Sequence, residues 1–142
     1  MENHLTQLGK IKVFEIMIKD PLFIYPKEKI STTELLMVRK NIGGLPVVKD
    51  HKDKQLIGII TQRDIRLARF AMSLNSPNTT VKDLMTPDPF KVKEDDTLLH
   101  VLEIMVNNKI QRLPVVNEVN ELKGLVIQNV ILKTLLQFFK NN

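Results

Sequence analysis

Apolar residues recur at three- and four-residue intervals along DDTLLHVLEIMVNNK, the stretch from residue 95 to residue 109. The recurring positions are Leu98, Val101, Leu102, Met105 and Val106. Because this spacing matches the roughly 3.6-residue turn of an α-helix, it predicts a helix with one apolar face. Thr97 stands just before the first apolar position, where its hydroxyl can cap a free backbone N–H of the first turn.

Short runs of β-branched and other apolar residues lie on either side of polar turns. LPVV occurs at residues 45–48 and again at residues 113–116, and each occurrence leads through a turn to a second run, LIGII or KGLVI. Runs of this kind, bounded by turn-forming residues, predict two β-strands in each half of the chain. Helical spacing returns after both second strands, so we expect closing helices over Asp64–Leu74 and Asn129–Lys140.

The two halves of the chain are copies of one unit. Residues 13–48 align without a gap to residues 81–116, and 11 of the 36 aligned pairs are identical. Both copies contain Met-x-x-Asp-Pro, at residues 17–21 and 85–89, and the Asp-Pro pair ends any preceding helix. After LPVV the second copy is two residues shorter, which a surface turn tolerates.

The repeated unit has the predicted order β-α-β-β-α. We expect repeat one over residues 11–74 and repeat two over residues 79–140, with residues 1–10 as an N-terminal extension and residues 71–80 as the connector. A unit of about 60 residues buries little core by itself. We therefore expect an α+β fold in which the two repeats pack by their sheets with pseudo-two-fold symmetry.

Composition narrows the class of protein. Hydrophobic residues make up 43% of the chain and charged residues 26%, which is an ordinary globular balance. The absence of cysteine excludes disulfides and thiolate metal sites. No run of about 18 apolar residues predicts a membrane span, and the N-terminus has no apolar signal segment, so we expect a cytoplasmic protein without a membrane partner. A net charge of +5 mildly favours anionic partners without the dense basic stripe of a nucleic-acid binder.

The junction between the second strand and the closing helix differs between the copies. It is GIITQRDI at residues 58–65 and GLVIQNVI at residues 124–131, so Thr61 and Asp64 correspond to Ile127 and Val130. One interpretation is structural, with Thr61 capping the helix and Asp64 favouring its positive end. A ligand-binding role is the other interpretation, and the two are compatible.

The paired LPVV segments, each followed by a Gly-led strand and a Thr-x-x-Asp position, resemble a tandem pair of CBS domains, known as a Bateman module. The resemblance covers roughly residues 11–139. It implies a non-catalytic regulatory module that binds AMP, ADP, ATP or S-adenosylmethionine in clefts between the repeats. It further implies a homodimer acting on a protein target that the sequence does not name, and no required cofactor.

The resemblance also implies roles for particular residues. In the family pattern the aspartate binds the ribose hydroxyls, the threonine lies near the phosphates, and a basic residue before LPVV of the opposite repeat holds phosphate. Asp64, Thr61 and Arg112 match these positions, and Gln111 stands where the family often has histidine. Further contacts expected by position are Ile18, Ile24, Ile42 and Leu45 for the adenine, and Lys19 and Asn129 for polar groups.

The second cleft would lack both halves of such a site. It would combine Ile127 and Val130 with Gly43 and Gly44, the residues before the first LPVV. None of these side chains offers a charge or a hydroxyl. We therefore expect one working cleft and one silent cleft.

Two alternative functions remain open. Arg63, Arg66 and Arg69 recur every three residues on the first closing helix, as a solvated face or as a surface for nucleic acid. The chain could thus be a nucleic-acid-associated accessory protein, although nucleic acid is not the expected partner. It could also be a ligand-free dimerisation module, for which the apolar surface of residues 135–139 would serve.

The sequence contains no catalytic constellation. His4, His51 and His100 lie far apart without metal-ligand spacing, so no metal site is expected. Neither a phosphate-binding GxxxxGK[ST] loop nor a serine or threonine with a histidine and acid partner occurs. We expect a protein that is not an enzyme.

Overall fold

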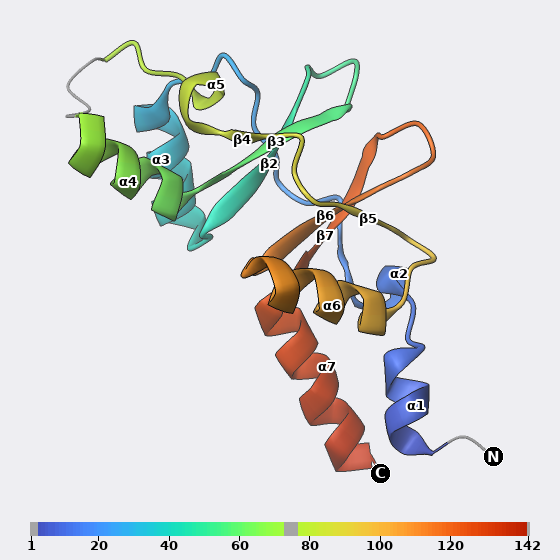
Figure 1. The fold of residues 1–142 in the computed structure, drawn as a ribbon. Helices are drawn as coiled ribbons and strands as arrows, with labels where there is room; N and C mark the ends of the chain where they lie inside the picture. The colour runs from blue at the N-terminus through green and yellow to red at the C-terminus, as the bar shows by residue number, and fades with distance from the viewer. Residues whose placement is uncertain (1–2, 73–76, 142) are drawn as a thin grey trace. The chain divides into compact units, whose positions relative to one another are not determined.

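The computed structural model describes residues 3–72 and 77–141. The chain divides into two compact units, which are drawn in Figure 1. Unit 1 consists of Met1–Pro21 with Phe90–Asn142, and unit 2 consists of Leu22–Pro89.

Unit 2 is a small sheet with helices around it. Its elements are α3 (Ile30–Lys40), β2 (Gly44–Val48), β3 (Leu56–Thr61), α4 (Gln62–Met72), α5 (Val81–Leu84) and β4 (Thr86–Pro87). The strand order is β2-β3-β4, and both neighbouring pairs are antiparallel. The core is formed by apolar side chains of the strands and of α3 and α4, among them Met37, Ile60 and Ile65. Glycine at residue 44 lies opposite Thr61, so the end of β3 is held next to the start of β2.

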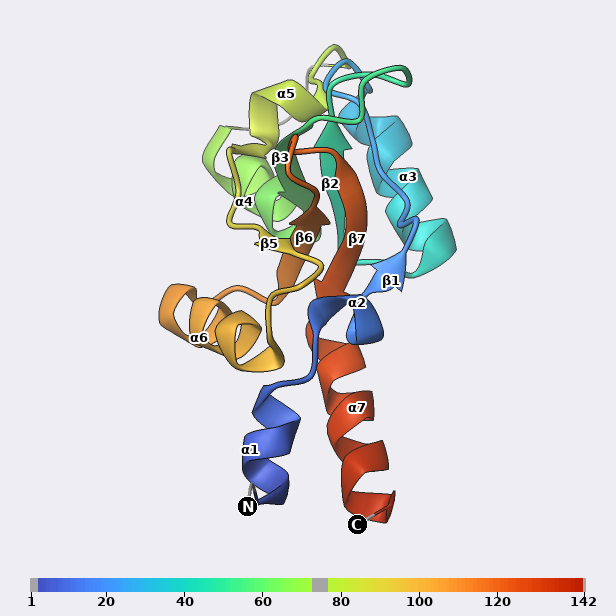
Figure 2. The ribbon, with the colours of Figure 1, turned by 90° about the vertical axis from the view of Figure 1, so that its right-hand side faces the viewer.

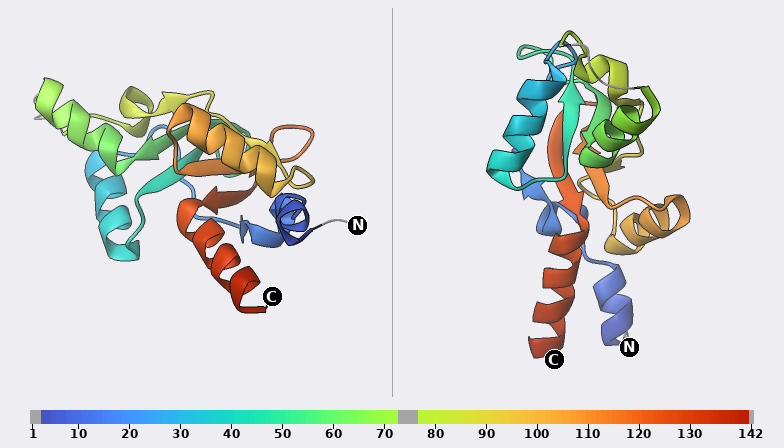
Figure 3. Two further views of the ribbon diagram at one scale, coloured as in Figure 1. Left: turned by 60° about the horizontal axis from the view of Figure 1, so that its bottom comes forward. Right: turned by 90° about the vertical axis from the view of Figure 1, so that its left-hand side faces the viewer.

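Unit 1 repeats this arrangement with two additional elements. Its elements are α1 (His4–Gly9), α2 (Val13–Ile16), β1 (Ile18–Lys19), β5 (Val92–Lys93), α6 (Leu98–Asn108), β6 (Arg112–Val116), β7 (Leu122–Ile127) and α7 (Gln128–Asn141). The sheet order is β1-β7-β6-β5, in which only β5 and β6 run parallel. Figure 2 shows β1 beside β7, and Figure 3 shows α7 continuing from the end of β7.

The predicted helices and the strands at and after each LPVV are present, whereas the first strand expected in repeat one is only an isolated bridge between Ile24 and Val47. Thr97 caps α6 as expected, with its hydroxyl accepting a hydrogen bond from the backbone N–H of His100 at 3.2 Å. The closing helices begin at Gln62 and Gln128, slightly earlier than predicted. Leu74, the expected end of the first closing helix, and the middle of the connector lie outside the described residues.

The N-terminal extension forms a helix that the repeat pattern did not predict. Asn3 caps α1 by accepting a hydrogen bond from the backbone N–H of Thr6 at 2.8 Å. Leu8 is buried in the core of unit 1, and the ring of His4 meets the ring of Phe138 edge to face. Part of the extension therefore belongs to the fold of unit 1.

The two repeats exchange their opening segments. The α2–β1 segment of repeat one pairs with β7 of repeat two, with Ile18 opposite Leu125. In the same way α5–β4 of repeat two pairs with β3 of repeat one, with Thr86 opposite Ile59. Each compact unit thus contains chain from both repeats, which explains why a unit boundary follows each Asp-Pro bend.

A glycine lets each exchanged segment approach its strand. A Cβ added to Gly124 would lie 2.5 Å from the sulfur of Met17 and 3.0 Å from the carbonyl oxygen of Ile18. A Cβ on Gly58 would lie 2.6 Å from the sulfur of Met85 and 3.0 Å from the carbonyl oxygen of Thr86. Neither glycine has a positive φ, so close approach, and not backbone conformation, is what these positions require.

We predict that Gly58→Ala and Gly124→Ala each lower the free energy of unfolding by about 1–3 kcal/mol, because a methyl group there overpacks the strand pair. Urea unfolding followed by circular dichroism measures this change. Gly9→Ala is the matched control, since its Cβ would meet Leu99 at an ordinary 3.7 Å and should change stability by less than about 0.5 kcal/mol. Equal stabilities for all three variants would contradict the prediction.

Candidate functional site

Thr61 and Asp64 form a reciprocal cap at the start of α4. The side chain of Asp64 accepts hydrogen bonds from the backbone N–H of Thr61 at 2.9 Å and from the Thr61 hydroxyl at 3.0 Å. The Thr61 hydroxyl in turn accepts from the backbone N–H of Asp64 at 3.2 Å. This is a capping box, so the structural interpretation of the Thr-x-x-Asp pattern is confirmed.

The cap leaves part of the aspartate available. All three contacts use Oδ2 of Asp64 or the Thr61 hydroxyl, and within the described part of the chain Oδ1 accepts no hydrogen bond. Both side chains are half-buried. The carboxylate is thus held in a fixed orientation with one oxygen unused, which is compatible with a second role.

Residues before β2 meet this cap at the same end of the sheet. The backbone N–H of Gln62 donates to the carbonyl of Gly43 at 2.9 Å, and the Gln62 side-chain amide donates to the carbonyl of Ile42 at 3.1 Å. Ile42 is half-buried at the edge of the unit 2 core. Unit 2 therefore brings Ile42 together with Thr61 and Asp64.

Two of the expected adenine contacts are core residues. Leu45 is 1% exposed and lies opposite Ile60 on the face of the hairpin that forms the unit 2 core. Ile24 is buried in the same core, next to Val47. Both were expected to contact adenine by position only, and strand pairing turns both side chains into the core, so they are not available to a ligand in this structure.

The corresponding junction of unit 1 carries the other expected residues. The backbone N–H of Gln128 donates to the carbonyl of Gln111 at 3.0 Å, and Arg112 lies opposite Ile127. Asn129 is exposed in the first turn of α7. Unit 1 thus gathers Gln111, Arg112 and Asn129 at one end of its sheet.

Ile18 and Lys19 are the other two candidates in unit 1. They form β1 at the edge of the sheet, opposite Leu125 and Gly124, and both are exposed. The ten candidates therefore fall into two groups of five, one in each unit. That the two groups face one cleft stays a prediction.

Arg112 is a half-buried cation that has no counter-ion among the residues that the structure describes. No ion pair or hydrogen bond joins its guanidinium to any described residue. Burial lowers the pKa of Arg112 from its ordinary value, because desolvation disfavours the charged form. A partly desolvated cation of this kind is stabilised by an anion, and the planar guanidinium suits phosphate or carboxylate.

The matching positions of the second copy are apolar, as the sequence shows. Ile127 ends β7 and Val130 lies in the first turn of α7, where it packs against the unit 1 core. The start of α7 therefore forms without the reciprocal cap of α4. The carbonyl of Val130 accepts a hydrogen bond from the Thr134 hydroxyl at 2.9 Å, which is internal to the helix.

The arginines of α4 are not equivalent. Arg69 forms a two-point ion pair with Glu34 of α3, and this contact raises the pKa of Arg69. Arg63 and Arg66 are exposed and have no ion-pair partner among the residues that the structure describes. One of the three arginines that could serve nucleic acid is thus occupied in joining two helices.

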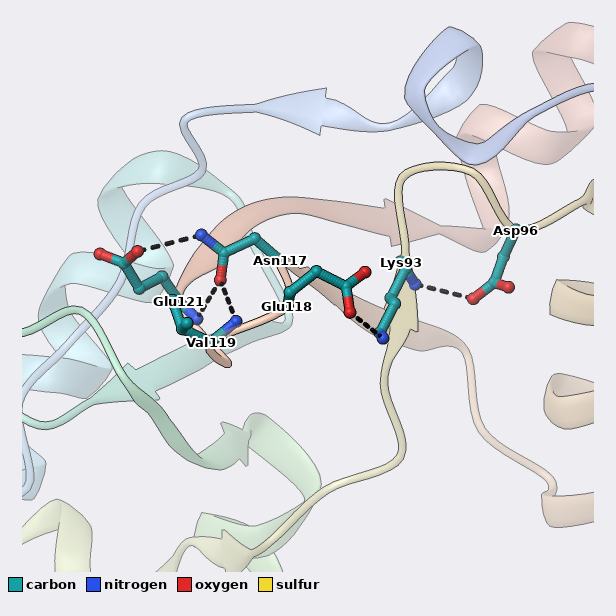
Figure 4. A network of polar contacts seen from close by, with 6 residues as sticks. All are labelled: Lys93, Asp96, Asn117, Glu118, Val119 and Glu121. Atoms are coloured by element: carbon teal, nitrogen blue, oxygen red, sulfur yellow. Dashed lines mark hydrogen bonds and ion pairs between the residues drawn. The ribbon is translucent and has the colours of Figure 1, made fainter.

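A polar network in unit 1, shown in Figure 4, was not predicted from the sequence. The Asn117 side chain accepts from the backbone N–H groups of Val119 and Glu121 at 3.1 and 2.9 Å, which closes the β6–β7 turn. Lys93 bonds Glu118 at 2.8 Å, and that pair raises the pKa of Lys93. The network stabilises a turn whose groups satisfy one another, so we assign it no ligand.

No helix among the described residues has the length and apolar character that crossing a membrane requires. No group of three or more potential metal ligands gathers within residues 3–72 and 77–141.

Comparison with known proteins identifies the family. The sequence matches the CBS domain over residues 13–70 and again over residues 81–137. The chain therefore belongs to the CBS-domain family. More particularly, it contains a tandem CBS pair, as the sequence repeat predicted.

Solved CBS pairs have the same fold. The CBS-pair protein CBSX2 of Arabidopsis thaliana, in a structure with AMP, matches with a TM-score of 0.81 and 26% identity over 91% of this chain and 98% of its own. The CBS pair of protein MJ0100, in complex with 5′-methylthioadenosine and S-adenosylmethionine, gives a TM-score of 0.77 and 27% identity over 92% and 98%.

The curated relatives are longer proteins. Inosine-5′-monophosphate dehydrogenase of Methanocaldococcus jannaschii is 38% identical over 130 residues, which is 92% of this chain and 24% of that enzyme. The enzyme of the same name from Bacillus subtilis is 33% identical over 128 residues, or 89% and 25%. The chain spans about a quarter of the length of the curated relatives that it matches.

We predict that Asp64→Ala lowers the free energy of unfolding by about 0.5–2 kcal/mol, because it removes the cap of α4. Asp83→Ala is a matched variant, since Asp83 accepts from the backbone N–H of Thr80 at 2.9 Å and from its hydroxyl at 3.2 Å in the same type of box. Chemical denaturation should show that the two variants lose similar amounts of unfolding free energy. A neutral Asp64→Ala would mean that the cap contributes nothing to stability.

We predict that Arg112→Met raises the free energy of unfolding of the unliganded protein by a few tenths to about 1 kcal/mol, because it removes a partly desolvated and unpaired cation. Lys123→Met, at an exposed strand position, serves as the control for loss of one positive charge and should be near neutral. Denaturant titration at low phosphate measures both. Marked destabilisation by Arg112→Met would show that the guanidinium makes a stabilising contact without ligand.

Proposed function

We propose that the chain is a non-catalytic regulatory module that binds one adenosine-containing ligand, AMP, ADP, ATP or S-adenosylmethionine, in a single principal cleft. The observation that carries this proposal is the unequal chemistry of two similar junctions. Within the described part of the chain, Asp64 has an unused carboxylate oxygen and Arg112 an unpaired guanidinium, whereas Val130 and Gly44 stand at the equivalent places.

Each candidate residue has a group suited to one part of the ligand. A carboxylate accepts hydrogen bonds from two vicinal hydroxyls, so Asp64 is matched to the ribose. Arg112 can donate two parallel hydrogen bonds to a phosphate, and Thr61 adds a hydroxyl at the start of a helix, where anions are favoured. Ile18 and Ile42 would contact the base, and Lys19, Gln111 and Asn129 would serve the polar end.

The solved relatives support adenosine as the shared chemistry. CBSX2 is described with AMP, and the CBS pair of protein MJ0100 with 5′-methylthioadenosine and S-adenosylmethionine. These ligands have the adenosine moiety in common and differ in what is attached at the 5′ position. Asp64 would bind the common part, and Arg112 would favour ligands with an anionic group.

A ligand held by both groups of residues would couple unit 2 to unit 1. Such coupling is how a sensor without a reaction of its own can act, because binding shifts the protein between states with different affinities for a partner. The regulated partner would be another protein in the cytoplasm. Neither a reaction nor a resident cofactor is needed for this role.

A ligand-free dimerisation module is the second candidate, and the capping box favours it. Thr61 and Asp64 have a complete structural role in stabilising α4 without any ligand. The nucleic-acid alternative has less support, because Arg69 is occupied by Glu34.

We predict that adenosine ligands raise the melting temperature of the wild type by several degrees. At a ligand concentration of about 100 Kd the stabilisation is about 2.7 kcal/mol. The panel contains AMP, ADP, ATP, S-adenosylmethionine and, as a control, inosine. Calorimetric titration should give one ligand per chain, because the second cleft lacks the required groups.

The two capping variants separate ligand binding from capping. Asp83→Ala should retain the ligand-induced shift although it loses a cap, whereas Asp64→Ala should lose most of it. If no adenosine compound shifts the wild type at millimolar concentration, the protein is not such a sensor. If both variants respond equally, Asp64 does not contact the ligand.

A further inference from the structure

The sulfur atoms of this chain belong to methionine alone, because it has six methionines and no cysteine. The structure describes four of these side chains, at Met17, Met37, Met85 and Met105. Met37 is 0% exposed and Met105 is 7% exposed, so both lie within the cores. Met17 and Met85 are half-buried, at the edges of the cores of unit 1 and unit 2. A small oxidant in solution can therefore reach these two thioethers while both units stay folded.

Each of these two thioethers fills the space that a glycine leaves beside a strand. A Cβ added to Gly124 would lie 2.5 Å from the sulfur of Met17 and 3.1 Å from its Cγ. A Cβ added to Gly58 would lie 2.6 Å from the sulfur of Met85 and 3.2 Å from its Cγ. Each sulfur therefore has no room for a further atom on the side of its glycine.

Oxidation changes both the size and the polarity of such a side chain. A sulfoxide adds one oxygen to the sulfur and turns an apolar thioether into a polar, chiral group, which disrupts apolar contacts. Met17 and Met85 each pack against the apolar core of their unit, where a polar group without a hydrogen-bond partner is unfavourable. The oxidised side chain is therefore expected to leave its place beside the glycine.

The segments that these methionines hold in place are short. β1 and β4 have two residues each, and each pairs with its neighbouring strand at two positions. The backbone N–H of Asp88 adds one contact beyond β4, to the carbonyl of Ile57 at 3.1 Å. Elements with so few contacts open locally, without global unfolding. The preceding helices α2 and α5 are anchored separately by Val13 and Val81, both 0% exposed, so release is confined to β1 and β4.

We propose that Met17 and Met85 are paired oxidation sites, at which a peroxide forms the sulfoxide and thereby releases β1 from β7 and β4 from β3. The sulfur lone pair attacks one oxygen of hydrogen peroxide, so that a sulfur–oxygen bond forms and the oxygen–oxygen bond breaks. The proton of the transferred hydroxyl passes to the departing hydroxide, which leaves as water. The sulfur loses the two electrons that the peroxide gains. Methionine sulfoxide reductases reverse the change with electrons from a thiol.

This inference goes beyond ligand binding and does not depend on it. β1 contains the candidate ligand contacts Ile18 and Lys19, but β4 contains none, so oxidation of Met85 acts where no ligand is proposed. The measurements that test it contain no adenosine compound, and a chain that binds no such compound still gives the expected results. Failure of one proposal is therefore distinguishable from failure of the other.

Peptide mass spectrometry after brief treatment with hydrogen peroxide measures the oxidation rate of each methionine. In the folded protein, Met17 and Met85 should oxidise about 10-fold or more faster than Met37 and Met105, because buried thioethers react only when the core opens. In concentrated urea the four rates should become equal. Equal rates in the folded protein, or slower oxidation of Met17 and Met85, would overturn the proposal.

Hydrogen exchange of the oxidised protein shows whether the two segments are released. We expect the amide hydrogens within residues 18–20 and 86–88 to exchange about 10-fold or more faster after oxidation, while those of α3 and α6 keep their rates. Treatment with methionine sulfoxide reductases should restore the original rates. Sulfoxide formation without faster exchange, or faster exchange throughout both units, contradicts the proposal.

Leucine variants assign each effect to its own sulfur. Leucine replaces methionine in a core at small cost and has no sulfur to oxidise. Met17→Leu should abolish the peroxide effect at β1 and leave the effect at β4, and Met85→Leu should do the reverse. Met37→Leu is the matched control, and its response to peroxide should equal that of the wild type. Release of β1 in peroxide-treated Met17→Leu would overturn the proposal, and the wild-type exchange rates test it even if one variant folds poorly.

Discussion

In each unit, a methionine packs closely against a glycine of a strand, and this contact holds the unit together. Met17 packs against Gly124 and Met85 against Gly58, and each contact fixes the opening segment of one repeat on the sheet of the other. β3 and β7 are thereby paired on both sides, so their ends occupy defined positions. The closing helices start at those ends, and the candidate ligand groups lie in the first residues that follow. Packing at the two glycines thus determines the positions of the candidate ligand groups.

The two junctions show how one backbone arrangement carries unequal chemistry. In each, the first residue of the closing helix donates its backbone N–H to the carbonyl of the residue just before the first strand of the hairpin, from Gln62 to Gly43 at 2.9 Å and from Gln128 to Gln111 at 3.0 Å. The frame is the same although Thr61 and Asp64 correspond to Ile127 and Val130, so this backbone arrangement does not depend on the polar side chains. Asp64 can cap a helix and still offer an oxygen, because a carboxylate has more acceptor sites than the cap requires. Structural and functional roles need not compete at such a residue.

Most of the helices and strands could be predicted because the periodic spacing of apolar side chains that indicates them lies within a short stretch of sequence. The caps at Thr97 and Thr61 and the long helices α4, α6 and α7 follow from spacing within about 15 residues, and the internal repeat extends the pattern to α3. The two-residue strands β1 and β4 have too few positions to show a period, so the exchange of segments was not predictable. Position in the sequence alone makes Leu45 a candidate ligand contact, whereas its pairing with Ile60 across the hairpin buries it. Long-range pairing is the information that a single sequence lacks.

The exchange of segments also sets an order for completing the molecule during synthesis. All of unit 2 is contained in one continuous stretch that ends at Pro89. Unit 1 must join Met1–Pro21 to Phe90–Asn142, so its N-terminal stretch can pair only after the second stretch has been synthesised. A folded unit 2 brings these two stretches closer than an unfolded loop of the same length would, and it lowers the entropy that closure removes. On the nascent chain the α2–β1 segment therefore lacks its partner strand until Leu122–Ile127 has left the ribosome.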